Sequence, residues 1–258
     1  MNTSAAAWVA QTSGVPLAYL EHSAPAPLET LWQRSDLGAA FMCGFPFASA
    51  AQRPNLIAAP VPSPPRYGGI PRYCTDFVVR ADRAFVHLSD TFGGRIGWTV
   101  EHSQSGYNAV RYHLLRYRRE RPEPLFAKWV GPLMTPRRVI EAVIEGEIDV
   151  GPLDSYVHDL LDHHEPETAS KLRTIEPTSM SPIPPLVASP AVGGDTVEHL
   201  RRTFLSCAAK PELAVILDTL MLAGFAPVDP ADYAGLLSQA RQADDGGVAK
   251  PASGALRG

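Results

Sequence analysis

Several features that often reveal a protein's class are scarce in this chain of 258 residues. It has three cysteines, Cys43, Cys74 and Cys207, which are far apart, cannot all pair and show no metal-ligand spacing. No apolar run is long enough to span a membrane. The residues before Leu17 lack the basic start and the apolar stretch of a signal peptide. We therefore expect no membrane insertion, and a cytoplasmic location as the sequence is written or a periplasmic one if a leader precedes it.

A dominant charge is also missing, because the net charge of -4 gives no sign of nucleic-acid binding. The basic run 116–121 is short and indicates a solvated helix end. Asp159, Asp162, His163 and His164 are of metal-ligand types, but they fall on the polar flank of one helix that ends at a proline. We expect no metal site and no cofactor.

What the chain does contain is a regular alternation of short apolar strands with helical patterns. This order predicts an α/β fold with a mostly parallel sheet that helices cover on both faces. Two apolar runs, 74–80 and 186–189, bracket a middle block that becomes a second lobe if both runs cross between lobes. The sequence thus predicts a discontinuous lobe 1 (1–78 and 186–241), a lobe 2 (79–185) and a disordered tail (242–258).

The most informative stretch runs from Gly97 to Arg118. An apolar strand leads into small polar residues, and a helical pattern follows at once. Ser103 or Ser105 suits the N-cap of that helix, and Gly106 lets a guest approach the backbone closely. The N–H groups and macrodipole of a helix start attract oxyanions. A plain N-cap without a ligand remains the alternative.

Two other strand ends carry candidate binding groups. Gly44 and Phe45 follow an apolar strand, so they lie either at a ligand-binding edge or in a tight aromatic turn. Asp154 lies where a strand ends and a helix begins. It is either a ligand-facing carboxylate or only the N-cap of that helix.

The order of these motifs resembles one family, the phosphate/phosphite/phosphonate substrate-binding proteins of ABC uptake systems. The motifs are Cys43-Gly44-Phe45-Pro46, Pro71-Arg72-Tyr73, Ser103-Gln104-Ser105-Gly106-Tyr107-Asn108, Gly146 to Val150, Asp154-Ser155-Tyr156 and Pro182 to Leu186. The resemblance covers about residues 35–240. It implies the type II periplasmic-binding fold, in which two α/β lobes are joined by two crossover strands with a ligand cleft between them.

The resemblance also implies a set of ligand-contacting residues: Gly44, Phe45, Tyr73, Ser103, Gln104, Ser105, Gly106, Tyr107, Thr135 and Asp154. The run 103–106 matches the helix start that grips an oxyanion. Gly44 and Phe45 match a first-lobe loop that closes the other side, and Tyr73 matches an aromatic residue at the hinge. Asp154 matches the carboxylate that receives the ligand's ammonium group in aminophosphonate binders.

Three features depart from the family pattern. Thr135 falls where the family often has a Gly-Ser-His stretch, so that histidine is absent here. The segment before Leu28 does not show the first strand of the fold. Glu101 lies next to the serines and would repel a dianion, which favours a neutral, monoanionic or zwitterionic ligand.

We therefore expect a non-catalytic binding protein that holds a small oxyanion or zwitterion, with an ABC permease as its partner. Two alternatives remain. One is a cytoplasmic ligand sensor that acts through a regulator. The other is an enzyme on the same fold, although the chain has no Gly-x-Ser-x-Gly nucleophile motif.

Overall fold

The computed structural model describes residues 3–23, 26–121 and 123–248. The chain divides into two compact units: unit 1 comprises Met1–Tyr73 and Met180–Gly235, and unit 2 comprises Cys74–Ser179 and Leu236–Gly258. Residues 236–241, which the sequence analysis placed in lobe 1, fall in unit 2. That the two units act as lobes closing on a ligand stays a prediction.

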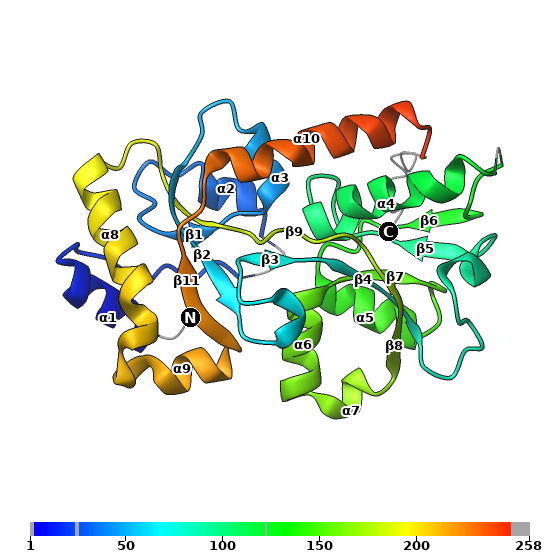
Figure 1. Ribbon diagram of the computed structural model, residues 1–258, viewed down its shortest axis with the longest axis horizontal. Coiled ribbons are helices and arrows are strands. Elements are labelled where there is room, and N and C mark those ends of the chain that lie inside the picture. Colours follow the sequence, from blue (N-terminus) through cyan, green and yellow to red (C-terminus); the bar gives the residue numbers. More distant parts are fainter. Residues whose placement is uncertain (1–2, 24–25, 122, 249–258) are drawn as a thin grey trace. The chain divides into compact units, whose positions relative to one another are not determined.

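Unit 1 is built on a four-stranded sheet in the order β1-β10-β2-β11 (Figure 1). The strands are β1 (Ala40–Phe41), β10 (Leu186–Ala188), β2 (Asn55–Pro62) and β11 (Leu222–Ala226). Helices α1 (Thr3–Ser13) and α8 (Gly194–Ser206) pack against each other, and Leu200 of α8 lies in one core with Ile57 of β2. The first strand of the described chain is thus β1, and the described residues before Leu28 contain helix α1 and no strand.

Short elements complete unit 1. They are α2 (Leu28–Trp32), α3 (Gly44–Ser49), η1 (Pro65–Tyr67), the strand pair β3 (Arg72–Tyr73) and β9 (Ser181–Pro182), η4 (Cys207–Ala209), η5 (Pro211–Leu213) and α9 (Ala214–Thr219). Helix α10 (Pro230–Asp245) begins in unit 1 and ends in unit 2.

Unit 2 contains a three-stranded sheet in the order β7-β4-β8 and the parallel pair β5-β6. The strands are β4 (Thr75–Arg80), β5 (Arg95–Gly97), β6 (Lys128–Val130), β7 (Gly151–Asp154) and β8 (Leu172–Pro177). The helical elements are η2 (Leu88–Thr91), η3 (Gln104–Asn108), α4 (Ala109–Arg118), α5 (Pro136–Ile144), α6 (Ser155–His164) and α7 (Pro166–Ala169).

Strand β4 supplies both faces of the unit 2 core. Successive side chains of a strand point to opposite faces. Phe77 accordingly packs in a cluster with Leu114 of α4, and Val78 packs in a separate cluster with Val139 of α5. The sheet of unit 2 is therefore covered by helices on both faces, as the alternation of elements predicted.

The expected strand direction was wrong. Within the described residues, every named pair in the sheets is antiparallel except β5-β6, to which a parallel bridge between Ile96 and Val150 is added. Alternating strands and helices produce parallel pairs only where consecutive strands become neighbours. Here neighbours such as β4 and β7 are far apart in the chain, so the alternation did not fix their direction.

The expected disorder from residue 242 was also wrong for the first part of that segment. Helix α10 continues to Asp245, and Val248 is buried in the unit 2 core. The buried Arg111 contacts this segment, since its Nη2 donates to Asp244 Oδ1 at 2.6 Å and to the Val248 carbonyl at 3.4 Å. Composition alone does not reveal such a partner. Residues 249–258 lie outside the described part.

Candidate functional site

The predicted oxyanion-gripping segment begins with a wide helical turn. Ser103 is the N-cap of η3, and its Oγ accepts a hydrogen bond from the Gly106 N–H at 2.9 Å. The Ala109 N–H donates to the Gln104 carbonyl, which is the five-residue spacing of a π-helix. The first N–H groups of a helix have no partner inside it and lie at the positive end of its dipole. The geometry therefore suits an anion.

Gly106 is required at this turn because Thr99 lies directly against it. The Thr99 N–H donates to the Gly106 carbonyl at 3.2 Å. A β-carbon added at Gly106 would lie 2.8 Å from the Thr99 Cβ, closer than real contacts allow. The strand end and the helix start are thus fitted together through a glycine.

Buried polar groups without partners gather around the same turn. Gln104 is fully buried, and within the described part of the chain neither atom of its side-chain amide has a hydrogen-bond partner. The same holds for the Tyr107 hydroxyl, the Thr99 hydroxyl and the Trp98 indole nitrogen. An unsatisfied buried polar group costs roughly 1–3 kcal/mol, so each needs an explanation such as a bound water or a ligand.

Asp154 has one of the two roles that the sequence left open. Its Oδ1 caps α6 by accepting from the Tyr156 and Val157 N–H groups at 2.9 and 3.2 Å. Its Oδ2 lies 3.4 Å from the Ser105 hydroxyl. Burial raises the pKa of the Asp154 carboxyl to about 6, although these hydrogen bonds act in the opposite direction. The N-cap role is present, and contact with a ligand remains a prediction.

A second ionisable pair lies beside Asp154, which the sequence analysis did not single out. Asp76 on β4 is fully buried and its Oδ2 lies 2.9 Å from Nδ1 of His158 on α6. The neighbouring Thr75 faces Asp154 across the strand pair and donates from its hydroxyl to the Ser105 carbonyl at 2.8 Å. The four-residue spacing of Asp154 and His158 places both on one face of α6, a signal that was available in the sequence.

Thr135 caps helix α5, since its hydroxyl accepts from the Arg138 N–H at 3.2 Å. The loop before it is attached to the strand end that leads to η3. The Leu133 N–H donates to the Trp98 carbonyl at 2.9 Å, and the Met134 N–H donates to the Thr99 carbonyl at 3.3 Å. Thr135 therefore directly follows a loop that is hydrogen-bonded to Trp98 and Thr99, and Thr99 contacts Gly106. The Thr135 hydroxyl itself is used as the cap of α5.

The remaining predicted residues belong to unit 1. Gly44 and Phe45 form the first turn of α3. Tyr73 is buried on β3, opposite Ser181 of β9. Of the predicted set, the structure brings together residues 103–107 and Asp154 within unit 2. It describes Gly44, Phe45 and Tyr73 in unit 1.

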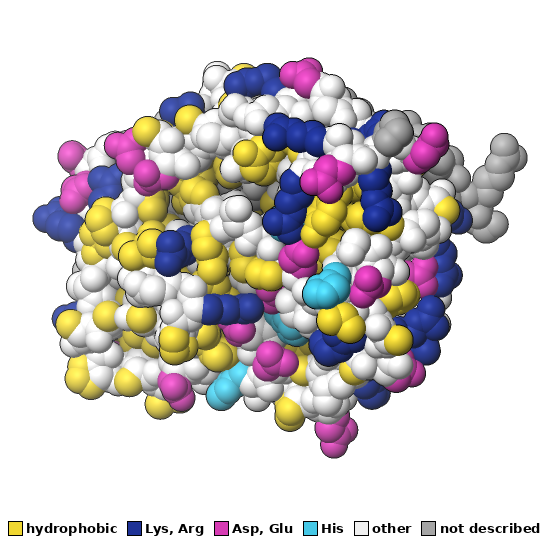
Figure 2. Space-filling model, turned by 45° about the vertical axis from the view of Figure 1, so that its right-hand side comes forward, with side chains coloured by type: hydrophobic (Ala, Val, Ile, Leu, Met, Phe, Trp, Pro, Cys, Tyr) yellow, Lys and Arg dark blue, Asp and Glu magenta, His cyan; other side chains and the backbone are white. Residues whose placement is uncertain are grey.

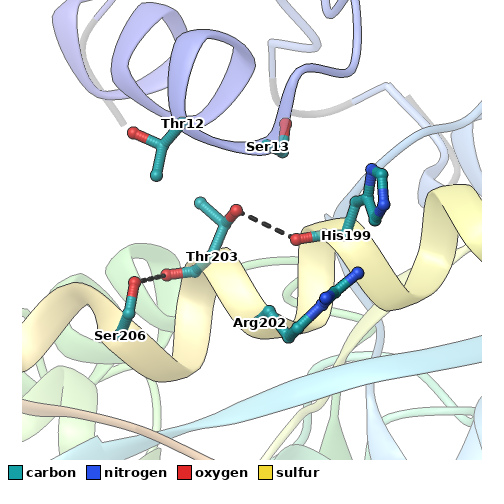
Figure 3. Close-up of a pocket in the computed structure, with 6 residues that line it drawn as sticks. All are labelled: Thr12, Ser13, His199, Arg202, Thr203 and Ser206. Atoms are coloured by element: carbon teal, nitrogen blue, oxygen red, sulfur yellow. Dashed lines mark hydrogen bonds between the residues drawn. The ribbon is translucent and has the colours of Figure 1, made fainter.

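A surface pocket of about 350 Å³ lies in unit 1, where none of the predicted site residues lines it. Figure 3 shows its lining side chains, which come from α1 and α8: Thr12, Ser13, His199, Arg202, Thr203 and Ser206. The hydroxyls of Ser13, Thr203 and Ser206 donate to carbonyls of their own helices. The protons of these three hydroxyls are therefore engaged within their own helices.

On the face in Figure 2, basic and acidic side chains are interspersed, with no single patch of one charge. No group of three or more His, Cys, Asp and Glu side chains in residues 3–23, 26–121 and 123–248 is placed to share a metal ion. Over the same residues, no helix has the length and apolarity needed to cross a bilayer.

Solved structures show the same fold. The binding protein component of an ABC phosphonate transporter from Pseudomonas aeruginosa is 20% identical, with a TM-score of 0.78 over 97% of this chain and 83% of that chain. PhnD1 from Prochlorococcus marinus, solved with methylphosphonate, is 16% identical, with a TM-score of 0.76 over 93% and 90%. XAC2383 from Xanthomonas citri, solved with ATP, is 20% identical, with a TM-score of 0.66 over 94% and 93%. These similarities confirm the type II periplasmic-binding fold that the motif order predicted.

Sequence comparisons give the family. No curated protein sequence matches the chain. The family model for the periplasmic, phosphonate substrate-binding protein of ABC transporters matches residues 5–233. This confirms the resemblance drawn from the order of the motifs. The chain belongs to the family of periplasmic substrate-binding proteins of phosphonate ABC transporters.

Proposed function

We propose that this protein binds a small phosphonate at the start of η3 in unit 2, without catalysing a reaction, and presents it to an ABC permease. The observation that carries the proposal is Gln104. Its side-chain amide is fully buried without a partner in the described protein, one residue before a serine that contacts Asp154. A ligand that hydrogen-bonds to the amide would remove the cost of burying it.

The chemistry of the candidate groups matches a phosphonate that also carries an ammonium group. Backbone N–H groups of a helix start suit the phosphonate oxygens. The Asp154 carboxylate suits a cation, because a nearby positive charge would offset the burial that raises its pKa. An aminoalkylphosphonate offers both ends. The contacts of Gly44, Phe45, Tyr73, Thr135 and Tyr107 with that ligand are part of the same proposal.

Family membership also bears on location and partner. The sequence left a cytoplasmic and a periplasmic location open, and a family of periplasmic substrate-binding proteins favours the second. For the partner, the family favours an ABC permease over a regulator. For the activity, it favours binding of the ligand over its turnover by an enzyme. We accordingly place the protein in uptake.

Calorimetric titration with methylphosphonate, 2-aminoethylphosphonate, phosphate and acetate tests this function. We expect a phosphonate to bind more tightly than acetate, and Ser105→Ala to weaken that binding about tenfold, the loss of one good hydrogen bond to a charged group. Ser170→Ala is the matched control, because Ser170 lies in the same unit and its hydroxyl donates only to the Glu167 carbonyl among described contacts. Failure of every phosphonate to bind, or equal affinity in S105A and S170A, would contradict the proposal.

A further inference from the structure

Each backbone carbonyl of residues 103–106 accepts a hydrogen bond from another part of the protein. Three of the donors are backbone N–H groups, those of Thr99, Asn108 and Ala109. The donor to the Ser105 carbonyl is instead a side chain, the hydroxyl of Thr75 on β4, at 2.8 Å. A carbonyl oxygen carries partial negative charge, so a turn that binds an anion needs its carbonyls directed away from the guest and its N–H groups toward it. The Thr75 hydroxyl serves this arrangement from outside the turn.

One peptide plane of the turn is held at both of its ends. The Ser105 carbonyl and the Gly106 N–H belong to the same planar unit. The N–H donates to the Ser103 hydroxyl oxygen at 2.9 Å, and the carbonyl accepts from the Thr75 hydroxyl at 2.8 Å. Rotation of this plane, which would change the direction of the neighbouring N–H groups and of the Ser105 side chain, therefore has to break both bonds.

Thr75 is firmly anchored in β4. It is fully buried, its N–H donates to the Thr178 hydroxyl oxygen at 2.9 Å, and its carbonyl accepts from the Thr178 N–H at 2.8 Å. On the other edge of β4 it lies opposite Asp154. Because alternate residues of a strand share a face, the Thr75 side chain lies on the face of Phe77, which packs in one cluster with Leu114 of α4. Helix α4 continues directly from η3, so this face directs the hydroxyl to the binding turn.

We propose that Thr75 is a positioning residue of the phosphonate site: its hydroxyl fixes the Ser105 carbonyl and thereby directs the Ser105 hydroxyl and the N–H groups of the turn toward the oxyanion. The inference rests on the proposed function, since Thr75 matters for binding only if the phosphonate binds at η3. Thr75 acts through Ser105 and does not have to touch the ligand. Because this role concerns the oxyanion end of the guest, it applies equally to phosphonates with and without an ammonium group.

Calorimetric titration with methylphosphonate and 2-aminoethylphosphonate tests this role. Thr75→Val keeps a branched side chain in the strand and removes the hydroxyl donor, so it should weaken binding of both probes about threefold to tenfold, the loss of one hydrogen bond. Thr75→Ser restores the donor and should restore the affinity. Thr91→Val is the matched control, because Thr91 is also buried in unit 2 and its hydroxyl also donates to a backbone carbonyl, that of Leu88 at 2.7 Å.

Amide hydrogen exchange tests the same role without a ligand. The Gly106 amide is protected by its bond to the Ser103 hydroxyl, at the other end of the peptide plane that Thr75 holds. Exchange at Gly106 should be faster in T75V, whereas exchange at Val79 in the core of β4 reports any general loss of stability. T75S should restore the protection of Gly106, and T91V should leave it unchanged relative to Val79. Thr75→Ala also removes the donor and replaces T75V in both experiments if T75V does not fold.

The outcomes distinguish the positioning role from the proposed function. Weaker binding of both probes in T75V, with normal binding in T75S and T91V, supports the positioning role. Equal affinity of T75V and wild type, or the same loss in T75V and T91V, would overturn it. Failure of the wild-type protein to bind either probe would refute the proposed function instead. In that case, unchanged exchange at Gly106 in T75V would show in addition that Thr75 does not order the turn.

Discussion

Gly106 and Thr99 lie in contact so close that no side chain fits between them. A β-carbon at Gly106 would lie 2.8 Å from both the Cβ and the Cγ2 of Thr99. We expect Gly106→Ala to lower the free energy of unfolding by about 1–3 kcal/mol, the usual cost of overpacking, and to weaken phosphonate binding because η3 has to shift. Urea unfolding and calorimetry measure the two effects.

Gly235 provides the control for this substitution. It lies in the interior of α10 and its φ is not in the left-handed region. A β-carbon added there would have no atom within 4 Å. Gly235→Ala should therefore stabilise the protein by up to about 1 kcal/mol through helix propensity. Equal stability of G106A and wild type would show that the contact with Thr99 relaxes without cost.

Substitution of Gln104 should change the stability and the ligand affinity in opposite directions. Gln104→Met keeps the side-chain volume and removes two unsatisfied polar atoms. It should raise the free energy of unfolding of the ligand-free protein by about 1 kcal/mol and weaken phosphonate binding. Thermal unfolding with and without methylphosphonate checks both signs. A Q104M protein that is less stable, yet binds normally, would mean that bound water already satisfies the amide.

Asp154 predicts a pH-dependent stability. Its pKa is raised from 3.8 to about 6, so the native carboxyl holds its proton more tightly than the unfolded one. The protonated carboxyl therefore contributes its full stabilisation to the native state below pH 4, and this contribution to the free energy of unfolding is lost as the pH rises to 6. Asp154→Asn keeps an oxygen for the α6 cap and removes the titration. D154N should thus gain about 1–2 kcal/mol over wild type between pH 4 and 7, a figure reduced for partial exposure.

Urea unfolding of both proteins at pH 4 and pH 7 gives this difference. Subtracting the D154N-minus-wild-type difference at pH 4 from the same difference at pH 7 cancels the titration of every other group whose pKa the substitution leaves unchanged. A constant difference between D154N and wild type would contradict the raised pKa of Asp154.

Arg111 holds the end of α10. It is buried, donates to Asp244 and Val248, and its guanidinium lies 5.0 Å from the centre of the Tyr107 ring. Arg111→Met should destabilise the protein by about 1–3 kcal/mol and speed amide hydrogen exchange at residues 243–248. Asp244→Asn is the milder control, because Asp244 is 40% exposed and an asparagine still accepts a hydrogen bond. Unchanged exchange in R111M would show that α10 is held by its apolar contacts alone.

The sequence was sufficient for local signals and insufficient for long-range ones. The sequence predicted Ser103 or Ser105 as one cap, and Asp154 as either a cap or a ligand contact; the Ser103 hydroxyl and the Asp154 carboxylate do accept N–H groups at helix starts. The motif order also led to the right family and fold. The π-helical turn at 104–108 was not predicted, because a five-residue spacing over one turn leaves no periodic pattern.

Interactions across the chain account for the other misses. Strand β11 pairs with β2, about 160 residues earlier in the chain, so its own short apolar run does not determine that pairing. Residues 242–248 contact Arg111, and the pairing of Asp76 with His158 depends on the packing of α6 on β4. None of these partners is adjacent in sequence.

The central claim is that the start of η3 grips the phosphonate. Nitrogen–proton NMR spectra recorded during addition of methylphosphonate test it most directly, because each backbone N–H reports its own surroundings. We expect the largest shifts at the amides of residues 104–108, with smaller ones at Tyr156 and Val157. Shifts confined to other segments, with the amides of 104–108 unmoved at saturation, would contradict it.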